Sequence, residues 1–344
     1  MDELTIKRVK TGLADPAIGP ETIALMLTDT CNLSCVYCRG GRIDDGRGKA
    51  EESELTTEEL FSFFEDAAGF KVKEVNIGGM RGEPFCKKDI RLILRKIKSL
   101  GLTGSMTTNG SMLSGALAEE MSSYGWDILL LSLDAPFARL QHQLRPAVNG
   151  KEYFHNILEF LGALNNNPGS RMRVLVNMVI TGNNYKYFPE MVDFVNNYRN
   201  IESLNVLRLV DMGLPGYSDL QLDRGQAAEF RETLEAFKRE KKVLYAGNWS
   251  SPDVRREMPA GRHTRCFTNY YILSIAANGD VLFCPQQYKA LSGLNIRDVR
   301  LRDLWLNEHF SFRKILSESA PCYGECCTIL RKQNEEIYNA VCDG

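Results

Sequence analysis

Three cysteines near the start of the chain are spaced C-x3-C-x2-C. Cys31, Cys35 and Cys38 follow the apolar run of residues 23–27. A loop this short can direct three thiolates at one centre, and thiolate sulfur is a soft ligand that suits zinc or an iron–sulfur cluster. A closed structural metal site usually has four protein ligands. Three thiols therefore leave one metal position open to a ligand that is not protein.

This cysteine loop, with Tyr37 just before its last cysteine, resembles the cluster loop of radical S-adenosylmethionine (SAM) enzymes. The resemblance implies that the three thiols hold a [4Fe-4S] cluster whose fourth iron binds SAM, and it places Tyr37 among the cofactor-binding residues. It further implies reductive cleavage of SAM to a 5′-deoxyadenosyl radical, with the electron supplied by an external donor such as flavodoxin or ferredoxin. The alternatives are a zinc-binding loop or three unrelated buried cysteines.

Polar residues at the ends of predicted strands resemble the SAM-binding elements of the same family. Residues 78–84 read Gly-Gly-Met-Arg-Gly-Glu-Pro, which is similar to the family's GGEP element with two residues inserted. Gly79 lets the backbone approach a ligand, and the resemblance implies that Glu83 binds the amino group of SAM. Further candidates for contacts to SAM or to the substrate, also from the resemblance, are Asn109, Ser132, Asp134, Arg145, Asn177 and Arg208.

A second set of cysteines lies in the last quarter of the chain. Cys266 and Cys284 flank Gly279 as C-x12-G-x4-C, which resembles the opening of the SPASM and twitch extensions of radical SAM enzymes. The resemblance implies one auxiliary [4Fe-4S] cluster; its ligands would be Cys266, Cys284, Cys322 and either Cys326 or Cys327. A structural zinc site on the same thiols is the alternative. The remaining thiols of Cys327, Cys342 and Cys86 are candidate hydrogen-atom donors to a substrate radical.

The elements that must position these residues alternate between strand and helix. Apolar runs separated by amphipathic segments at this spacing are typical of βα units, and they predict a parallel sheet with helices outside it. Crossovers of one hand would curl the sheet, so we expect an α/β fold with a partial (β/α)6 TIM-like barrel over residues 21–247. The six predicted strands are residues 21–27, 72–77, 104–108, 126–133, 173–180 and 204–210.

Both ends of the chain depart from this alternation. Residues 1–20 show no strong periodicity and are expected to form a lead-in. Near the other end, Asn-Gly at 278–279 lies between apolar runs at 270–276 and 281–284, which is a strong hairpin signal. Residues 298–306 and 310–316 are expected to be helical. We therefore expect residues 248–344 to form a small β-hairpin and helix domain of the twitch type.

Composition limits the class of protein. The 344 residues are 44% hydrophobic and 25% charged, with a net charge of −2, so no overall positive field would attract nucleic acid or an anionic membrane. The acidic N-terminus lacks the apolar core of a signal peptide, and no apolar run is long enough to span a membrane. These features predict a cytoplasmic protein, in which cysteines are more often metal ligands than disulfides.

The motifs specify the cofactor more closely than the substrate. About twenty residues precede the first predicted strand, which leaves no room for the N-terminal peptide-binding domain common in leader-dependent relatives. We therefore expect a polar small-molecule substrate, such as an aminocyclitol, aminosugar or sugar nucleoside of antibiotic biosynthesis. The alternatives are a peptide- or protein-modifying enzyme of the same family and, in another class, a non-catalytic zinc-binding interaction protein.

Overall fold

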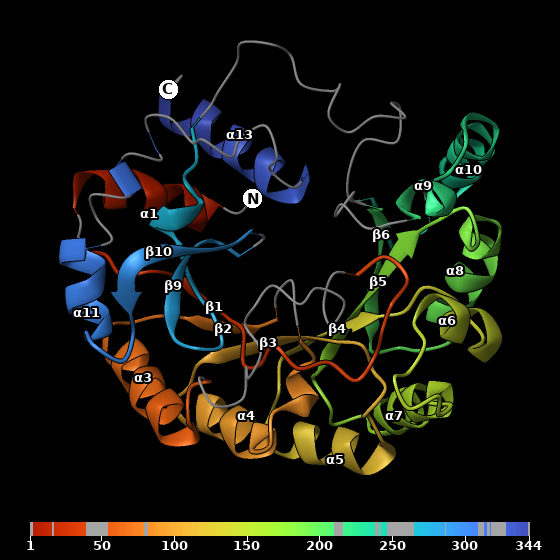
Figure 1. The fold of residues 1–344 in the computed structure, drawn as a ribbon, viewed down its shortest axis with the longest axis horizontal. Coiled ribbons are helices and arrows are strands. Elements are labelled where there is room, and N and C mark those ends of the chain that lie inside the picture. Colours follow the sequence, from red (N-terminus) through yellow and green to blue (C-terminus); the bar gives the residue numbers. More distant parts are fainter. Residues whose placement is uncertain are drawn as a thin grey trace.

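The chain folds around one curved sheet with helices along its outer face (Figure 1). The computed structural model describes residues 3–15, 17–38, 54–78, 82–209, 216–237, 240, 242–245, 265–285, 287–308, 313–314, 317 and 328–342. Within these residues the strand order is β10-β9-β8-β1-β2-β3-β4-β5-β6-β7. Strands β1 to β7 therefore follow one another in chain order, which is the arrangement of an open barrel.

Seven parallel strands form the barrel part of the sheet. They are β1 (Thr22–Leu25), β2 (Glu74–Ile77), β3 (Thr103–Thr108), β4 (Ile128–Ser132), β5 (Arg173–Ile180), β6 (Ile201–Arg208) and β7 (Val243–Tyr245). Each pairs in parallel with the next. The six strands expected from the sequence are present, and the predicted α/β fold with a parallel sheet is confirmed. The short β7 was not predicted.

Helices cover the outer face of the barrel sheet in an arc (Figure 1). They are α3 (Thr57–Gly69), α4 (Ile90–Ser99), α5 (Gly115–Ser123), α6 (Ala138–Leu144), α7 (Phe154–Asn166), α8 (Phe188–Asn196), α9 (Tyr217–Leu220) and α10 (Arg224–Ala236). Pro146 lies between α6 and α7. Thr56 caps α3 in a reciprocal capping box with Glu59, which explains why the helix begins there.

The two faces of the sheet differ in polarity. Along β1 and β2 the side chains alternate between buried and half-buried positions. Ile23 and Val75 have no exposed surface and belong to the hydrophobic core with the helices. Polar side chains occupy the other face, where Asn76 Nδ2 donates to Ser105 Oγ over 2.7 Å. The interior of the barrel is therefore suited to a polar ligand.

The C-terminal part continues the same sheet instead of lying apart from it. Strand β8 (Ile272–Ile275) pairs in parallel with β1, and β9 (Asp280–Cys284) returns antiparallel to β8. The predicted hairpin is thus present, with Gly279 in its turn at a φ of +89°. An unpredicted strand, β10 (Gln287–Asn295), pairs with β9, and α11 (Leu301–Asp303) with the π-helical turn η4 (Leu304–Glu308) lies in the predicted helical region 298–306.

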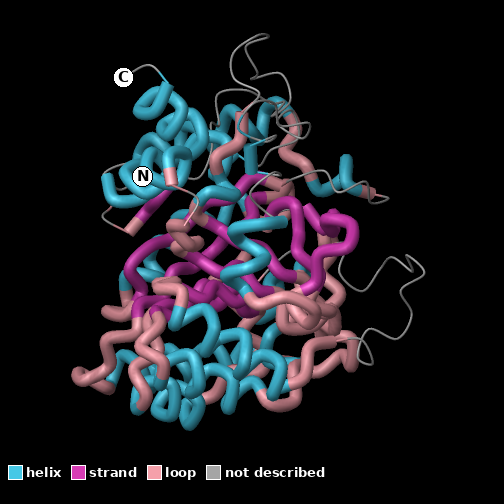
Figure 2. The backbone as a smooth tube through the Cα atoms, turned by 90° about the vertical axis from the view of Figure 1, so that its left-hand side faces the viewer, coloured by secondary structure: helices cyan, strands magenta, loops and turns pink. Residues whose placement is uncertain are grey.

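The N-terminal segment, expected as a lead-in without strong periodicity, contains a helix. Helix α1 (Glu3–Ala14) contacts α13 (Thr328–Cys342), and both lie on the same side of the strand layer in the two views (Figures 1 and 2). Val9 and Ile337 join Phe267 and Tyr270 in a small apolar cluster. This packing, which links the two ends of the chain, stabilises α1. No helix in the described part of the chain is long and apolar enough to cross a membrane.

Candidate active site

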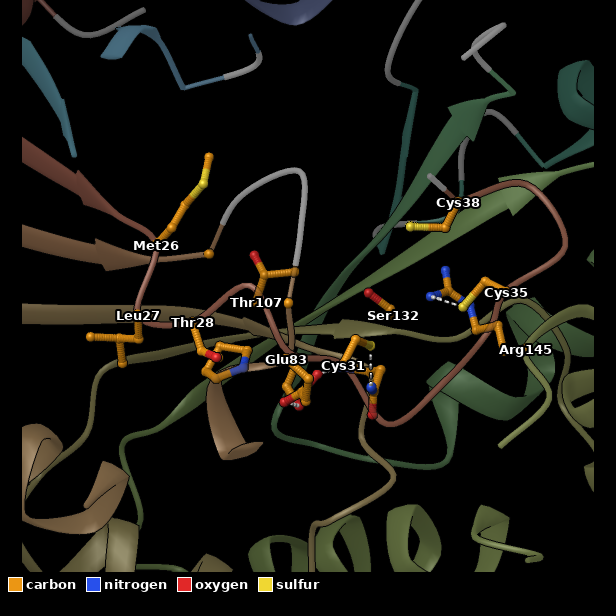
Figure 3. Close-up of a pocket in the computed structure, with 15 residues that line it drawn as sticks. Met26, Leu27, Thr28, Cys31, Cys35, Cys38, Glu83, Thr107, Ser132 and Arg145 are labelled. Carbon is orange, nitrogen blue, oxygen red and sulfur yellow. Dashed lines mark hydrogen bonds between the residues drawn. The ribbon is translucent and has the colours of Figure 1, made fainter. Parts of the chain in front are cut away.

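A pocket of about 140 Å³ opens at the carboxyl ends of β1 to β4 (Figure 3). Parallel α/β folds place their binding sites at this edge of the sheet. All three cysteines of the first motif line it, together with Glu83, Asn109, Ser132 and Arg145. Gly78, Gly82 and Pro84 of the 78–84 element also line it, as do Met26, Leu27, Thr28, Thr107 and Thr108. All of them lie at the end of a strand or in the segment that follows one.

The cysteine loop is held by a segment more than a hundred residues away. Residues 32–36 run antiparallel to residues 144–148, directly after α6. Ser34 N donates to the Pro146 carbonyl and Val36 N to the Leu144 carbonyl, both over 2.9 Å. An isolated antiparallel bridge joins Leu33 to Ala147. The loop backbone is therefore fixed by hydrogen bonds of its own, independent of any ligand.

Asn109 connects the end of β3 to the cysteine loop. Its Nδ2 donates to Asn32 Oδ1 over 3.0 Å and lies 3.8 Å from Cys31 Sγ. Its Oδ1 accepts from the N and Oγ of Ser111, at 2.9 and 2.6 Å. The amide orientation follows from this network, because the oxygen faces donors and the nitrogen faces the acceptor and the sulfur. Asn109 thus lies between the pocket and a cluster cysteine.

Glu83 presents a buried carboxylate to the pocket. It is 2% exposed, and it accepts from Thr108 Oγ1 over 2.6 Å and from Asn109 N over 2.7 Å. Burial raises the pKa of Glu83 to about 7, although these hydrogen bonds act in the opposite direction. A positive group entering the pocket would favour the ionised form of this carboxyl. This is the electrostatic environment that an ammonium group requires.

The backbone before Glu83 needs a glycine. Gly82 has a φ of +73°, and a Cβ built on it would lie 2.0 Å from the Thr28 carbonyl oxygen. The next amide, Glu83 N, donates to the Thr30 carbonyl over 2.8 Å. Gly82 therefore lets the Glu83 segment approach the chain that leads into the cysteine loop. Gly79, the glycine predicted to let the backbone approach a ligand, lies outside the described residues.

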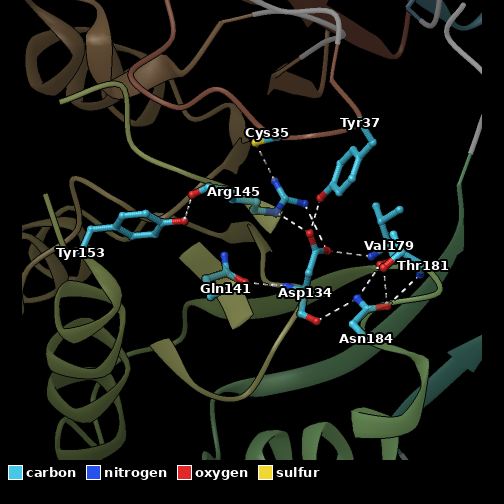
Figure 4. A network of polar contacts seen from close by, with 9 residues as sticks. All are labelled: Cys35, Tyr37, Asp134, Gln141, Arg145, Tyr153, Val179, Thr181 and Asn184. Carbon is cyan, nitrogen blue, oxygen red and sulfur yellow. Dashed lines mark hydrogen bonds and ion pairs between the residues drawn. The ribbon is translucent and has the colours of Figure 1, made fainter. Parts of the chain in front are cut away.

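Asp134, Arg145 and Tyr37 form a buried network beneath the loop (Figure 4). Asp134 has no exposed surface; Arg145 Nε and Nη2 donate to its two carboxylate oxygens at 2.7 and 3.3 Å. Tyr37 Oη and Val179 N also donate to this carboxylate. Burial alone would lower the pKa of Arg145, but the Asp134 carboxylate raises it well above its usual value.

The network directs a positive charge at the cysteine loop. Arg145 Nη1 lies 4.0 Å from Cys35 Sγ, and the guanidinium stands 5.4 Å from the centre of the Tyr37 ring. Burial raises the pKa of the Cys35 thiol to about 12, and the guanidinium opposes this rise. In this arrangement Asp134 anchors Arg145 and Tyr37, whereas the sequence analysis had expected it to contact the cofactor directly.

Two predicted residues lie further along the barrel. Asn177, on β5, accepts from Asn205 Nδ2 over 2.8 Å, and Arg208 ends β6. Neither lines the pocket that holds the three cysteines. Ser132, at the end of β4, does line it. The structure therefore brings together the candidates from β1 to β4 and from the segment after α6, and it leaves those on β5 and β6 outside this pocket.

The donor set fits an iron–sulfur cluster. Each cysteine of a cluster binds a different iron, so cluster thiols stand further apart than the ligands of a single ion. All three thiols line one pocket. Three soft thiolates facing one space fit the protein ligands of a [4Fe-4S] cluster that leaves its fourth iron open.

The second cysteine set is only partly described. Cys284 ends β9, and Cys266 Sγ lies 3.6 Å from Asn334 Nδ2 of α13. Three other predicted ligands or donors, Cys322, Cys326 and Cys327, lie outside the described residues. Cys342 ends α13, but its side chain is not among those described. The auxiliary cluster, the boundary at residue 248 and the hydrogen-atom donors remain predictions.

Comparison with known proteins identifies the family. Residues 25–195, about half of the chain, match the model of the radical SAM superfamily. The chain belongs to the radical SAM superfamily. The matched region contains the cysteine loop, Glu83 and the Asp134–Arg145 pair, so the family match and the pocket concern the same residues.

Individual relatives differ in how much of the chain they match. A probable GTP 3′,8-cyclase of Halobacterium salinarum is 31% identical over 175 residues, which are 50% of this chain and 46% of that protein. The chain thus spans about half the length of that relative. A PqqA peptide cyclase of Streptomyces rochei is 28% identical over 298 residues, which are 85% of this chain and 76% of that protein.

Solved structures share the fold over most of the chain. SuiB of Streptococcus suis, bound to S-adenosylmethionine, has a TM-score of 0.62 at 19% identity and covers 91% of this chain and 72% of its own. The anSMEcpe structure with bound AdoMet has a TM-score of 0.60 at 14% identity, covering 93% of this chain and 96% of that one. These likenesses support the partial barrel fold.

Proposed function

We propose that the protein is an enzyme that cleaves SAM reductively and uses the 5′-deoxyadenosyl radical to take a hydrogen atom from a carbon of its substrate. The observation that carries this proposal is the single pocket lined by Cys31, Cys35, Cys38 and the buried Glu83 carboxylate. A [4Fe-4S] cluster bound to the three thiols would supply the electron and the open iron position for SAM. The chain itself supplies binding, orientation and the exclusion of water.

The residues around the pocket have distinct roles in this proposal. Glu83 receives the ammonium group of SAM, because it is the acidic side chain that lines the pocket and is already oriented by Thr108 and Asn109. Arg145 is held by Asp134 and places its charge beside Cys35 and the pocket. Asn109 and Ser132 offer neutral polar groups to the carboxylate or the ribose of SAM.

The C-terminal cysteines extend the proposal. Cys266 and Cys284 would bind an auxiliary [4Fe-4S] cluster with Cys322 and either Cys326 or Cys327. The remaining thiol of that pair, or Cys342, would be placed to donate a hydrogen atom to a substrate radical. The electron donor for the SAM cluster is a flavodoxin or a ferredoxin.

For the substrate we propose a peptide. Support comes from the PqqA peptide cyclase, whose match extends over 85% of this chain and therefore past the cofactor-binding half. SuiB, whose fold is similar, has been solved with its precursor peptide. The matches to GTP 3′,8-cyclases stop at about half of the chain. The small-molecule substrate expected from the sequence has no comparable support.

Anaerobic reconstitution tests the cofactor part of the proposal. We expect about eight iron atoms per chain, and formation of 5′-deoxyadenosine when SAM and dithionite are added. Replacing Cys31, Cys35 or Cys38 by Ala should remove about four irons and all SAM cleavage. Ser123→Ala, an exposed substitution at the end of α5 that lines neither pocket, is the control and should retain both. Zinc without iron in the purified protein would rule the proposal out.

Isotope transfer tests the substrate. The enzyme should be incubated with SAM and a deuterated peptide encoded by a short reading frame beside its gene. Deuterium in 5′-deoxyadenosine together with a changed peptide mass would support a peptide substrate. Deuterium transfer from a labelled aminocyclitol or aminosugar, with none from the peptide, would instead restore the small-molecule prediction.

A further inference from the structure

A second pocket lies directly behind the wall of the SAM site. It measures about 300 Å³ and lies between the start of α4 and the segment before α5. The short helix η1 (Pro84–Cys86) separates the two pockets, since Pro84 lines the SAM site and Phe85 and Cys86 line the second pocket. This outer pocket is therefore separated by one helical turn from the pocket that the three cysteines line.

The wall between the pockets contacts the cluster loop itself. Cys86 lies beside the backbone N–H of Asn32, the residue that follows Cys31. The Asn32 side chain donates to Ser111 Oγ over 2.8 Å, and the adjacent Met112 lines the outer pocket. Two separate connections thus join this pocket to the residue that follows a cluster cysteine.

Exposed apolar side chains surround the outer pocket. Leu92, on α4, is 55% exposed and Met112 is 46% exposed. Both line the pocket, and among the described residues they are two of the few large apolar side chains with such exposure. Exposed apolar side chains that are gathered at one site and surrounded by polar ones are typical of an interaction surface.

Basic side chains outnumber acidic ones among the residues that line this pocket. Lys87, Lys88 and Arg91 line it together with Asp89, and of these Lys87 pairs with Glu54 over 2.9 Å. Lys88 is exposed, and Arg91 is 62% and Arg95 57% exposed at their side chains while both pair with Glu120. The surface is therefore complementary to an acidic protein.

We propose that this outer pocket, with Leu92 and Met112 at its centre and Lys88 and Arg91 on its rim, is the docking surface for the one-electron donor, an acidic flavodoxin or ferredoxin. The proposal rests on the proposed function and gives it a place on the chain. Electron transfer slows steeply with distance, and this surface is separated from Cys31 by one layer of residues. One electron leaves the donor and one enters the cluster, with no bond made or broken. Transient complexes of this kind need only a small interface.

Comparison of two reductants tests the docking surface separately from the chemistry. The variant Lys88→Glu/Arg91→Glu changes the rim charge, and Leu92→Gln/Met112→Gln changes its apolar centre. Lys7→Glu/Lys10→Glu on α1 makes the same change of charge on exposed residues far from the site. For each variant, the rate of 5′-deoxyadenosine formation by the reconstituted holoenzyme is measured with three reductants. The first is dithionite, the second is limiting bacterial flavodoxin with its NADPH-dependent reductase, and the third is a reduced ferredoxin.

We expect both site variants to lose about tenfold in rate with the protein donor and to keep the wild-type rate with dithionite. The α1 variant should match the wild type with every reductant. Raising the ionic strength from about 0.05 M to about 0.5 M should slow the wild type with the protein donor and should leave the rim variant nearly unchanged. The proposal is overturned if the site variants keep full activity with both protein donors, if dithionite-driven activity falls equally, or if neither protein donor supports the wild type. Failure of the wild type with dithionite would instead contradict the proposed function.

Discussion

The buried ion pair between Asp134 and Arg145 gives a quantitative test of the site. Replacing Arg145 with Met removes the two hydrogen bonds of 2.7 and 3.3 Å and leaves the Asp134 carboxylate buried with Tyr37 and Val179 as donors. Breaking a buried pair from one side costs about 3–5 kcal/mol, mostly because the remaining charge has no counter-charge. For a chain of 344 residues, this corresponds to a fall in Tm of roughly 4–7 °C.

A second substitution should recover much of that loss. In Asp134→Asn/Arg145→Met no buried charge remains, and the new amide can accept from Val179 N and donate to Tyr37 Oη. The double variant should therefore be more stable than Arg145→Met alone, by more than half of the single variant's loss. The coupling between the two sites is then read from a double-mutant cycle of anaerobic thermal unfolding.

An exposed ion pair provides the control. Arg173 pairs with Glu202 over 3.2 Å, and both side chains are about half exposed. Arg173→Met should cost no more than about 1 kcal/mol, because water screens such pairs. If Arg145→Met were equally mild, or if the double variant were as unstable as the single one, the reasoning about Asp134 as a buried anchor would be refuted.

Two further predictions concern the neighbouring Gly82–Glu83 segment. Gly82→Ala should destabilise the protein by about 2–4 kcal/mol, because its Cβ meets the Thr28 carbonyl at 2.0 Å and its φ is +73°. Gly125→Ala, with a φ of +71° and open space, should cost only about 1 kcal/mol in the same unfolding assay; equal losses would contradict the steric argument. The pKa of Glu83 is raised from 4.5 to about 7. Its contribution to the free energy of unfolding of the SAM-free protein is therefore fully present below about pH 4.5 and is lost as the pH rises through 7. The loss should total about 3 kcal/mol by pH 8, and Glu83→Gln should abolish this slope in pH-dependent unfolding; an unchanged slope would show that another group titrates.

The sequence predicted the barrel strands because each is an apolar run bounded by polar loops. The same criterion missed β7, which has only three residues and follows two lysines. It also missed α1, whose apolar positions are few and whose packing partners lie at the other end of the chain. Elements that depend on distant contacts have weak local patterns, and this explains both omissions.

In the candidate site, too, residues in local motifs were predictable, whereas contacts between distant segments were not. The three cysteines and Glu83 were found from the sequence because each lies in a short motif that resembles one of the family's. The antiparallel pairing of residues 32–36 with 144–148 was not predictable, since no local feature of either segment indicates the other. Asp134 illustrates a further limit, because an aspartate after a strand is compatible with a ligand contact and with a buried anchor. Only its complete burial and the donors around it distinguish these roles.

The anchoring of the cysteine loop has a consequence for the cofactor. The loop is fixed by the 144–148 segment, by Asn109 and by the Asp134–Arg145–Tyr37 network, and of these Asn109 and Arg145 line the pocket themselves. A buried guanidinium next to Cys35 favours additional negative charge on a centre bound there, and therefore its reduced state. Asp134 sets the position of that guanidinium without reaching the pocket. Substitutions at a residue that contacts no cofactor should therefore change the reduction potential of the cluster as well as the stability of the fold.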